Sequence, residues 1–138
     1  MLTCMAMRVD YSFDLDHLAA SQTEFLREGL EIERPRFPSM EEVAGALGGR
    51  TRIECISTPG DCVDGFFEAF WRRPEALLDP AVRSAQSMWP LLGPGVEEKM
   101  IARLAAALES GSWDAEHGHL RREESFDGSL RLVVSSPD

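Results

Sequence analysis

The segment from Pro59 to Pro80 constrains this chain more than any other part of its sequence. A Pro-Gly pair predicts a turn at its start, and Asp61 follows as a candidate helix cap. Large apolar residues then recur at helical spacing, until Pro74 prevents continuation. These residues are Val63, Phe66, Phe67, Phe70 and Trp71. We therefore expect this segment to be a hinge between two halves of the chain, and its best candidate for a functional surface.

The residues before this segment predict a strand, two helices and a second strand. Residues 2–13 alternate apolar and polar side chains, which indicates a strand with one buried face. The apolar positions are Val9, Tyr11 and Phe13. A helix should follow and end at the Arg34-Pro35 step, and a capping box over residues 39–42 begins a shorter one. The Gly48-Gly49 pair ends that helix, and residues 51–57 predict a strand with both faces partly covered.

The residues after the segment predict two helices and a hairpin. A helix begins at Asp79-Pro80, and residues 96–109 form the most strongly helical stretch of the chain. Residues 113–119 show no regular pattern. Strands are then expected over residues 120–126 and 129–135. The Asp-Gly pair between them is typical of a type I′ turn.

In chain order, these elements predict one α/β domain over residues 1–138. The sheet should be mixed, with parallel central strands joined by crossovers and a C-terminal antiparallel hairpin at one edge.

Charge and cysteine content indicate the compartment and exclude some partners. The formal charge of −10 argues against binding to nucleic acid or to an anionic membrane. The three cysteines, Cys4, Cys55 and Cys62, form no CxxC pair, which favours free thiols in a reducing compartment. The short apolar start before Arg8 lacks the pattern of a signal peptide. We therefore expect a cytoplasmic protein.

Two aspartates near the turn are the first candidates for chemistry. Asp61 and Asp64 flank Cys62 at a predicted helix start. They could be acids or bases that face a substrate, or they could cap the helix, as acidic residues commonly do there. A nucleophilic Cys62 is disfavoured, because the two neighbouring carboxylates oppose its thiolate form.

The aromatic residues that follow have two interpretations. Four aromatic side chains within Phe66–Trp71 are typical of a core, yet they span more than one helix face, so one of them could line an apolar pocket. Arg72 and Arg73 could bind an anionic substrate, or they could complement the helix dipole.

A histidine pair supplies a weak metal-binding pattern. His117 and His119 lie one residue apart beside Glu116, and two such histidines could share a metal on a strand. A closed zinc site needs four ligands, and no partner at a fixed spacing is visible. We predict no metal site. Phosphate-binding loops, nucleophile elbows and dinucleotide-binding glycine motifs are also absent from the sequence.

Several motifs together resemble the later half of bacterial class I S-adenosylmethionine-dependent methyltransferases. The motifs that carry the resemblance are Asp61-Cys62-x-Asp64-Gly65-Phe66, Phe70-Trp71-Arg72-Arg73-Pro74-Glu75-Ala76, Leu78-Asp79-Pro80-x-Val82-Arg83, Leu108-Glu109-Ser110-Gly111-Ser112-Trp113-Asp114 and Leu130-Arg131-Leu132-Val133-Val134. The resemblance covers roughly residues 9–136 and begins near the family's fourth strand.

The resemblance implies a partial Rossmann-like fold whose last strand runs antiparallel. It implies S-adenosylmethionine as the cofactor, but the glycine-rich turn and the ribose-binding acid of the family's first half have no counterpart here. It also implies that Asp61 and Asp64 help to orient a small-molecule substrate, with Phe66 and Trp71 covering it. It assigns no cofactor-binding residue and leaves the catalytic residues unknown.

Three functions follow from these observations. The chain could be the substrate-side half of a methyltransferase. A missing N-terminal part or a partner chain would then complete it, and its gene could be truncated or split. It could instead be a non-catalytic binding module derived from that fold, which dimerises through an exposed sheet edge. It could also be a small biosynthetic enzyme of another chemistry, with Asp61, Asp64 and the histidines as its acid–base candidates.

Overall fold

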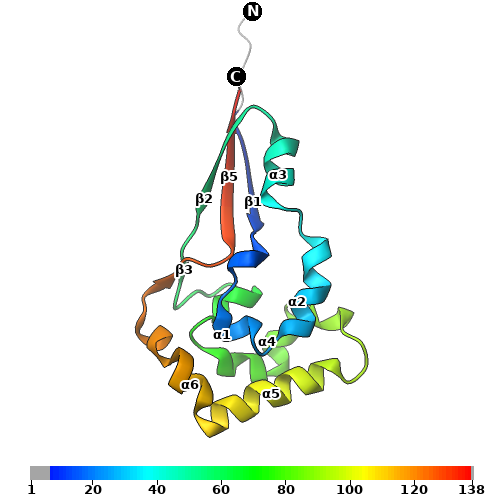
Figure 1. Ribbon diagram of the computed structural model, residues 1–138, viewed down its shortest axis with the longest axis vertical. Helices are drawn as coiled ribbons and strands as arrows, with labels where there is room; N and C mark the ends of the chain where they lie inside the picture. The colour runs from blue at the N-terminus through cyan, green and yellow to red at the C-terminus, as the bar shows by residue number, and fades with distance from the viewer. Residues whose placement is uncertain (1–6, 138) are drawn as a thin grey trace, which may run out of the picture.

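A narrow three-stranded sheet extends from one end of a helical body (Figure 1). The structure is a computed structural model and describes residues 7–137. The strands are β1 (Arg8–Phe13), β2 (Arg50–Cys55), β3 (Thr58–Pro59), β4 (Ser125–Phe126) and β5 (Leu130–Ser136). The α-helices are α1 (Ala20–Thr23), α2 (Arg27–Glu33), α3 (Met40–Leu47), α4 (Pro80–Ser84), α5 (Val96–Ser110) and α6 (Ser112–His117). Short 3₁₀ helices are η1 (Leu15–His17), η2 (Arg34–Arg36), η3 (Phe67–Phe70), η4 (Pro74–Leu78), η5 (Trp89–Leu91) and η6 (Gly118–Arg122).

Several predicted boundaries are confirmed. The Ser39 side chain accepts a hydrogen bond from the Glu42 amide and Glu42 reaches back, so the capping box begins α3. Gly48 and Gly49 both have positive φ angles where α3 ends. The Asp79 side chain caps α4, in which Pro80 is the first residue. The helix over residues 96–109 is α5.

The topology of the sheet differs from the prediction. The last strand, β5, lies between β1 and β2 and runs antiparallel to both, so no parallel strands are neighbours within residues 7–137. The expected C-terminal hairpin is also wrong, because residues 120–122 belong to η6 and β4 pairs with β3 instead of β5. The backbone carbonyl of Ser129 accepts from the Asp14 amide at 2.7 Å. This bond directs the chain toward β1 instead of back along β4.

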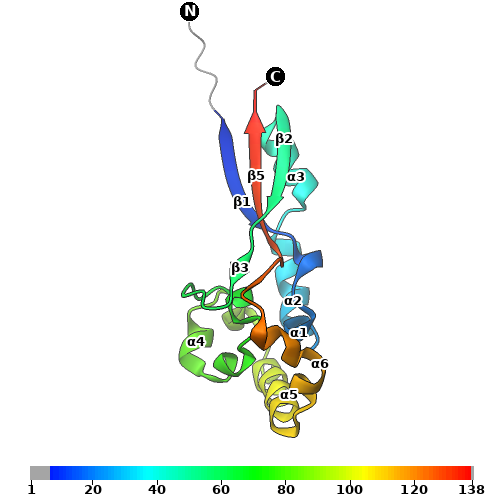
Figure 2. The same cartoon turned by 90° about the vertical axis from the view of Figure 1, so that its left-hand side faces the viewer.

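The predicted burial of the two outer strands is wrong as well. Val9 and Tyr11 of β1 are 52% and 69% exposed, and every residue of β2 is exposed. The reason is visible in Figure 2, where the sheet stands clear of the helical body and α3 is the one helix beside it. Burial in this sheet lies mostly in the middle strand, in which Val133, Val134 and Ser135 are buried. In β1 only Ser12 is buried.

The predicted helix over residues 61–71 does not form, and only η3 appears at its end. Side chains form hydrogen bonds with backbone groups that a helix would have paired with one another. The Asp64 carboxylate accepts from the Phe66 amide at 3.0 Å, and Arg73 donates to the Cys62 carbonyl. Arg72 likewise donates to the Gly60 carbonyl at 3.0 Å. The two arginines therefore hold this loop and do not complement a helix dipole.

Two other helix predictions also need correction. The long helix expected after Asp14 is divided into η1, α1 and α2, and the irregular stretch at 113–119 is mostly α6. The first helix breaks at Ala19, whose amide donates to the buried Glu68 carboxylate at 3.2 Å.

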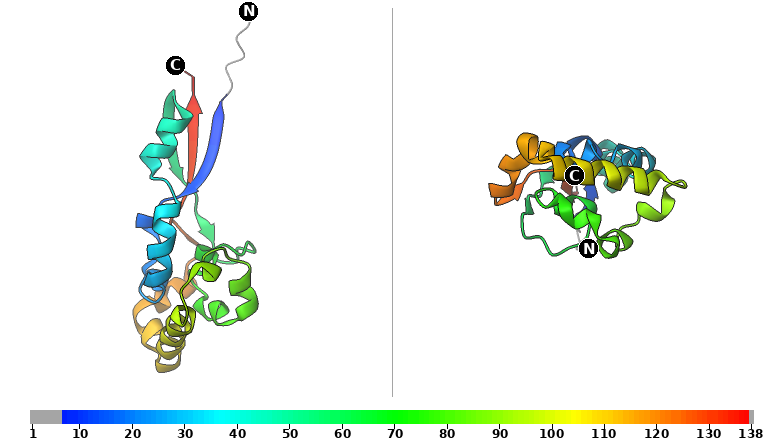
Figure 3. Two further views of the ribbon diagram at one scale, coloured as in Figure 1. Left: turned by 90° about the vertical axis from the view of Figure 1, so that its right-hand side faces the viewer. Right: turned by 90° about the horizontal axis from the view of Figure 1, so that it is seen from below.

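The core lies in the helical body, where α5 crosses the end of the molecule away from the sheet (Figure 3). Its largest fully buried apolar side chains are Trp71, Trp113, Leu26, Leu77, Met100 and Leu104. Phe70 and Trp71 are therefore core residues, as the first of the two interpretations predicts. Among the described residues, no helix has the length and apolar character needed to cross a membrane.

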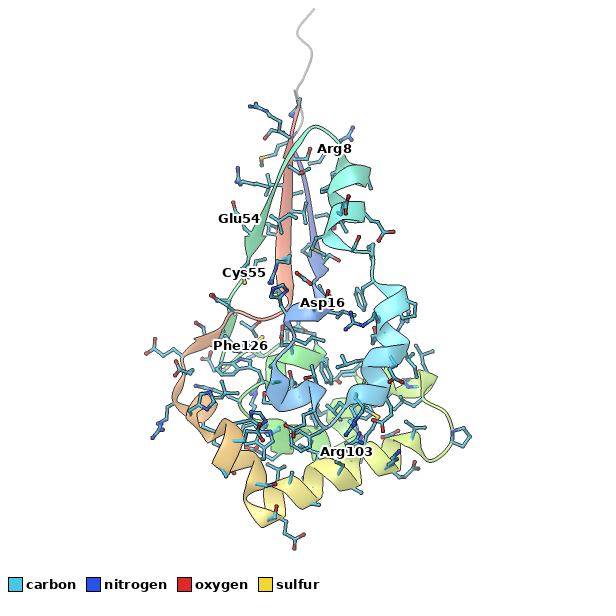
Figure 4. The ribbon with its side chains drawn as sticks, in the orientation of Figure 1. Arg8, Asp16, Glu54, Cys55, Arg103 and Phe126 are labelled. Carbon is cyan, nitrogen blue, oxygen red and sulfur yellow. The ribbon has the colours of Figure 1, made fainter. Side chains whose placement is uncertain are left out.

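Arg103 of α5 joins that helix to the loop between α1 and α2 (Figure 4). It donates to the Phe25 carbonyl at 2.6 Å and to the Glu28 carboxylate at 2.5 Å. The hydrogen bonds from Arg103 lower the pKa of Glu28 from 4.5 to about 2. A depressed carboxylate pKa stabilises the fold above the unfolded value, and this stability is lost as the pH falls toward the folded value.

We predict that Glu28→Gln is less stable than the wild type at pH 7, by about 1 kcal/mol because the pair is partly screened by solvent. The difference should shrink as the pH falls toward 2, where about half of the wild-type carboxylates are protonated. Denaturant unfolding of both proteins at pH 7 and pH 2 measures this difference in the free energy of unfolding. A difference of the same size at both would show that the ion pair does not carry the effect.

Candidate functional site

A cavity of about 410 Å³ lies where the carboxyl end of β1 meets the helical body. Phe13, Leu15 and Leu18 form the β1–η1 side of it, and Leu30 and Phe37 come from α2 and the following loop. The opposite walls are the segment from Asp64 to Glu68 and the segment from Ala85 to Met88. Ser129 completes the lining at the start of β5.

Aromatic packing forms part of the lining of this cavity. The Phe13 ring contacts Phe37 edge-on at a centroid distance of 5.5 Å and Phe66 at 5.7 Å. Phe13 therefore connects the sheet to the loop after η2 and to the segment that contains Phe66. The resulting surface is largely apolar, as is common in pockets for small molecules.

The polar groups of the lining are acidic or neutral. Its three carboxylates belong to Glu33, Asp64 and Glu68, and none of the described lining residues is basic. Glu33 is paired with Arg36 at 2.5 Å, whereas Glu68 forms no salt bridge with any described residue. The described lining residues therefore present no positive charge to a bound anion.

Glu68 is the best-connected polar residue of the site. It is 1% exposed, and its carboxylate accepts from the Ala19 amide at 3.2 Å, the Ser129 amide at 2.8 Å and the Ser129 hydroxyl at 2.6 Å. Burial raises the pKa of Glu68, although the hydrogen bonds from Ser129 and Ala19 and the charge of Arg131 oppose that rise. Glu68 thereby joins η3, the start of α1 and the start of β5 around the cavity.

Gln86 is a buried polar residue of the opposite wall. The residue is 7% exposed, and its Oε1 accepts from the Trp89 indole nitrogen at 2.8 Å. This bond fixes the orientation of the amide, because an indole nitrogen can only donate. The Nε2 group of Gln86 is buried and has no hydrogen-bond partner among the described residues.

The structure places two of the four predicted substrate-binding residues at this cavity. Asp64 and Phe66 line it. Asp61 is exposed and does not line it, and Trp71 is fully buried against Phe126, with ring centroids 5.4 Å apart. Figure 4 labels Phe126 on the strand that follows α6. Asp61 caps no helix, since none begins there, whereas Asp64 caps the turn before η3.

The histidines lie in another part of the molecule. His117 is buried in α6 and bonds to Glu24 at 3.0 Å, while His119 lies in η6, so the two do not share a strand. Glu24, Glu116 and His117 bring their ligand atoms within 4.8 Å of one another. Because Glu24 and Glu116 are exposed and His117 packs beside Trp113, a structural hydrogen bond explains this group.

Sequence reasoning missed Glu68, Gln86 and Ser129 as residues of the site. Glu68 had a signal, since it is the one charged residue within the apolar run Phe66–Trp71. A carboxylate at such a position is buried and needs partners. Gln86 and Ser129 carried no comparable signal.

Comparison with known proteins shows a shared fold. The chain is similar to the crystal structure, at 2.40 Å resolution, of a candidate methyltransferase from an antibiotic biosynthesis pathway of Anabaena variabilis ATCC 29413. The TM-score is 0.80 at 24% sequence identity. The match covers 94% of this chain and 54% of the other, so this chain spans about half the length of that protein. No family model and no curated protein matches the sequence.

We predict that Glu68→Gln flattens the dependence of stability on pH above the ordinary carboxyl range. The raised pKa means that Glu68 stabilises the fold while protonated, and this contribution is lost as the pH rises through the folded value. Glutamine cannot ionise, so the variant should not lose that stability. Urea unfolding at a series of pH values tests this. Parallel profiles for the two proteins would show that burial does not raise the pKa of Glu68.

Proposed function

We propose that this chain is the substrate-side half of an S-adenosylmethionine-dependent methyltransferase, and that it acts with a complementary part that supplies the cofactor site. The observation that carries the proposal is the structural match, which spans nearly all of this chain and about half of a candidate methyltransferase. The motif resemblance in the segment 61–83 supports it independently.

The position of the cavity also supports this assignment. In mostly parallel α/β sheets, ligands bind beyond the carboxyl ends of the strands. Here β1 and β2 share one direction, because both run antiparallel to β5. The cavity lies at the carboxyl end of β1, next to Phe13. A chain that provides the substrate half of such an enzyme needs a pocket at that place.

We place the cofactor site in the complementary part, because the glycine-rich turn and the ribose-binding acid of the family's first half have no counterpart in this sequence. The cofactor would supply the methyl group from that part, and the cavity of this chain would hold the methyl acceptor.

The residues of this chain would then bind and align the methyl acceptor. Methyl transfer depends mainly on the alignment of nucleophile and methyl group, so positioning by a shaped apolar cavity can suffice. Phe13 and Phe66 would hold the acceptor, and the Asp64 carboxylate could orient a donor group on it.

A chimaera tests this proposal. We predict that replacing the matched part of the Anabaena protein with this chain gives a folded protein that binds tritium-labelled S-adenosylmethionine, while this chain alone binds none. Equilibrium dialysis measures binding, with the parent Anabaena protein as the control. A folded chimaera without cofactor binding, beside a parent that binds, would contradict the proposal.

A second candidate function is a module that dimerises through its sheet. The exposure of β1 and β2 favours it, because both outer edges are unpaired within the described residues and carry apolar side chains such as Tyr11 and Ile53. Homodimerisation would cover one such edge.

Light scattering after size-exclusion chromatography separates this candidate from the first. The dimerising module predicts a dimer in solution. In the variant Val9→Lys, the dissociation constant of this dimer should rise at least about tenfold, because a charge on an edge strand blocks pairing. Val63→Lys is the matched control, because Val63 is fully exposed and lies outside the sheet. A monomer at every concentration would exclude dimerisation through the sheet.

A further inference from the structure

Asp64 provides the accessible carboxylate of the cavity. The residue is exposed, and it belongs to the segment that forms one wall. Its Oδ1 accepts from the Phe66 amide at 3.0 Å, which holds the carboxylate beside the backbone of that wall. A carboxylate has about four acceptor positions, and no salt bridge among the described residues involves Asp64. It can therefore accept from a donor on a bound molecule as well.

The other two carboxylates of the lining are already engaged. Glu33 is buried and pairs with Arg36 at 2.5 Å. Glu68 is 1% exposed and accepts three hydrogen bonds from amide and hydroxyl groups of the protein. None of the described lining residues is basic. The accessible charge that a ligand meets in this lining is therefore the negative charge of Asp64.

The aromatic part of the lining also keeps accessible surface. The rings of Phe13, Phe37 and Phe66 are only partly buried, and Phe13 contacts the other two at centroid distances of 5.5 and 5.7 Å. A volume of about 410 Å³ lies within the range of small-molecule pockets. Aromatic side chains stack with rings and attract a cation placed over their faces. The lining is therefore complementary to an aromatic ring that carries a positive charge.

We propose that this cavity binds an arylalkylamine, a compound in which an aromatic ring carries an alkylammonium group. The ring packs against Phe13, Phe37 and Phe66, and the nitrogen donates to the Asp64 carboxylate. Such a nitrogen is protonated at pH 7, like that of a lysine side chain, so it supplies both the donor and the opposite charge.

The inference rests on the proposed function, because it names the class of the methyl acceptor. An ammonium nitrogen has no lone pair, so it first releases one proton to solvent, to which Asp64 is exposed. The lone pair then forms the bond to the methyl carbon, while the bond between that carbon and the sulfur of the methyl donor breaks. Binding of the protonated amine precedes these steps and is measured without cofactor.

Three compounds of similar size serve as probes of the intact chain. Benzylamine carries the cation, benzyl alcohol carries a neutral donor, and benzoate carries an anion. Nitrogen-15 NMR titrations give their dissociation constants, and the Phe66 amide reports on the Asp64 carboxylate to which it is bonded. We expect saturable binding of benzylamine with a shift of that amide. Its dissociation constant should be about threefold lower than that of benzyl alcohol, which is the effect of an accessible ion pair, and benzoate should bind most weakly.

Asp61 offers a matched control for the charge of Asp64. Both aspartates are exposed and lie in the same loop, but only Asp64 lines the cavity. Asp64→Asn keeps an oxygen for the Phe66 amide and removes the charge, so the preference for benzylamine over benzyl alcohol should disappear. Asp61→Asn removes an equal charge and should leave that preference unchanged. Nitrogen-15 spectra of the two variants show whether each keeps the fold.

Ionic strength provides a second measurement that needs no variant. Salt screens an accessible ion pair far more than it affects apolar contacts. Raising the ionic strength to about 1 M should therefore remove most of the preference for benzylamine in the wild type. A preference that does not depend on salt would contradict an ion pair with Asp64.

Three further results would overturn the inference. They are equal affinities for benzylamine and benzyl alcohol in the wild type, an equal loss of the preference in the Asp61 and Asp64 variants, and no saturable binding of benzylamine. These outcomes are independent of the chimaera experiment. Benzylamine binding beside a folded chimaera that binds no cofactor would contradict the proposed function alone, and the reverse would contradict the ligand class alone.

Discussion

The buried carboxylate of Glu68 holds together the three segments around the cavity. It accepts hydrogen bonds from Ala19, at the start of α1, and from the amide and hydroxyl of Ser129, before β5. Gly128 makes this approach possible, since a Cβ atom there would lie 2.2 Å from the Glu68 carboxylate. The position of β5 in the sheet and the end of the first helical stretch both depend on this residue.

This constraint explains why the segment 59–80 is central to the fold. Residues 60–66 form a loop whose carbonyls are held by Arg72 and Arg73, and η3 then brings Glu68 into the interior. The same short stretch packs the core through Trp71 and lines the cavity through Phe66. A site built on such a segment couples the substrate pocket directly to the fold of the helical body.

Local sequence signals predicted the elements whose stabilising groups are close in the chain. The capping box of α3, the Asp79-Pro80 start of α4 and the glycine end of α3 are all of this kind. The predictions failed where a side chain that is distant in the sequence forms a hydrogen bond with a backbone group. Glu68 ends a helix at Ala19, 49 residues away, and redirects the chain at Ser129, 61 residues away. Periodicity within a window contains no information about such bonds.

The candidate site, like the fold, was predictable only in part. Asp64 and Phe66 lie in the segment that the motifs single out, and both line the cavity. Trp71 and Asp61 share that segment but not the cavity, because the expected helix, which would have set their directions, does not form. Gln86 and Ser129 enter the site only through tertiary packing, and no local pattern marks them.

Amide hydrogen exchange at Ala19 and Ser129 tests most directly whether Glu68 organises the cavity. Both amides should exchange far more slowly than that of Val63, which lies in the exposed loop nearby. Glu68→Ala should accelerate both exchange rates together, because one carboxylate protects both groups. Exchange at either amide as fast as at Val63, or acceleration of only one of them in the variant, would contradict this account.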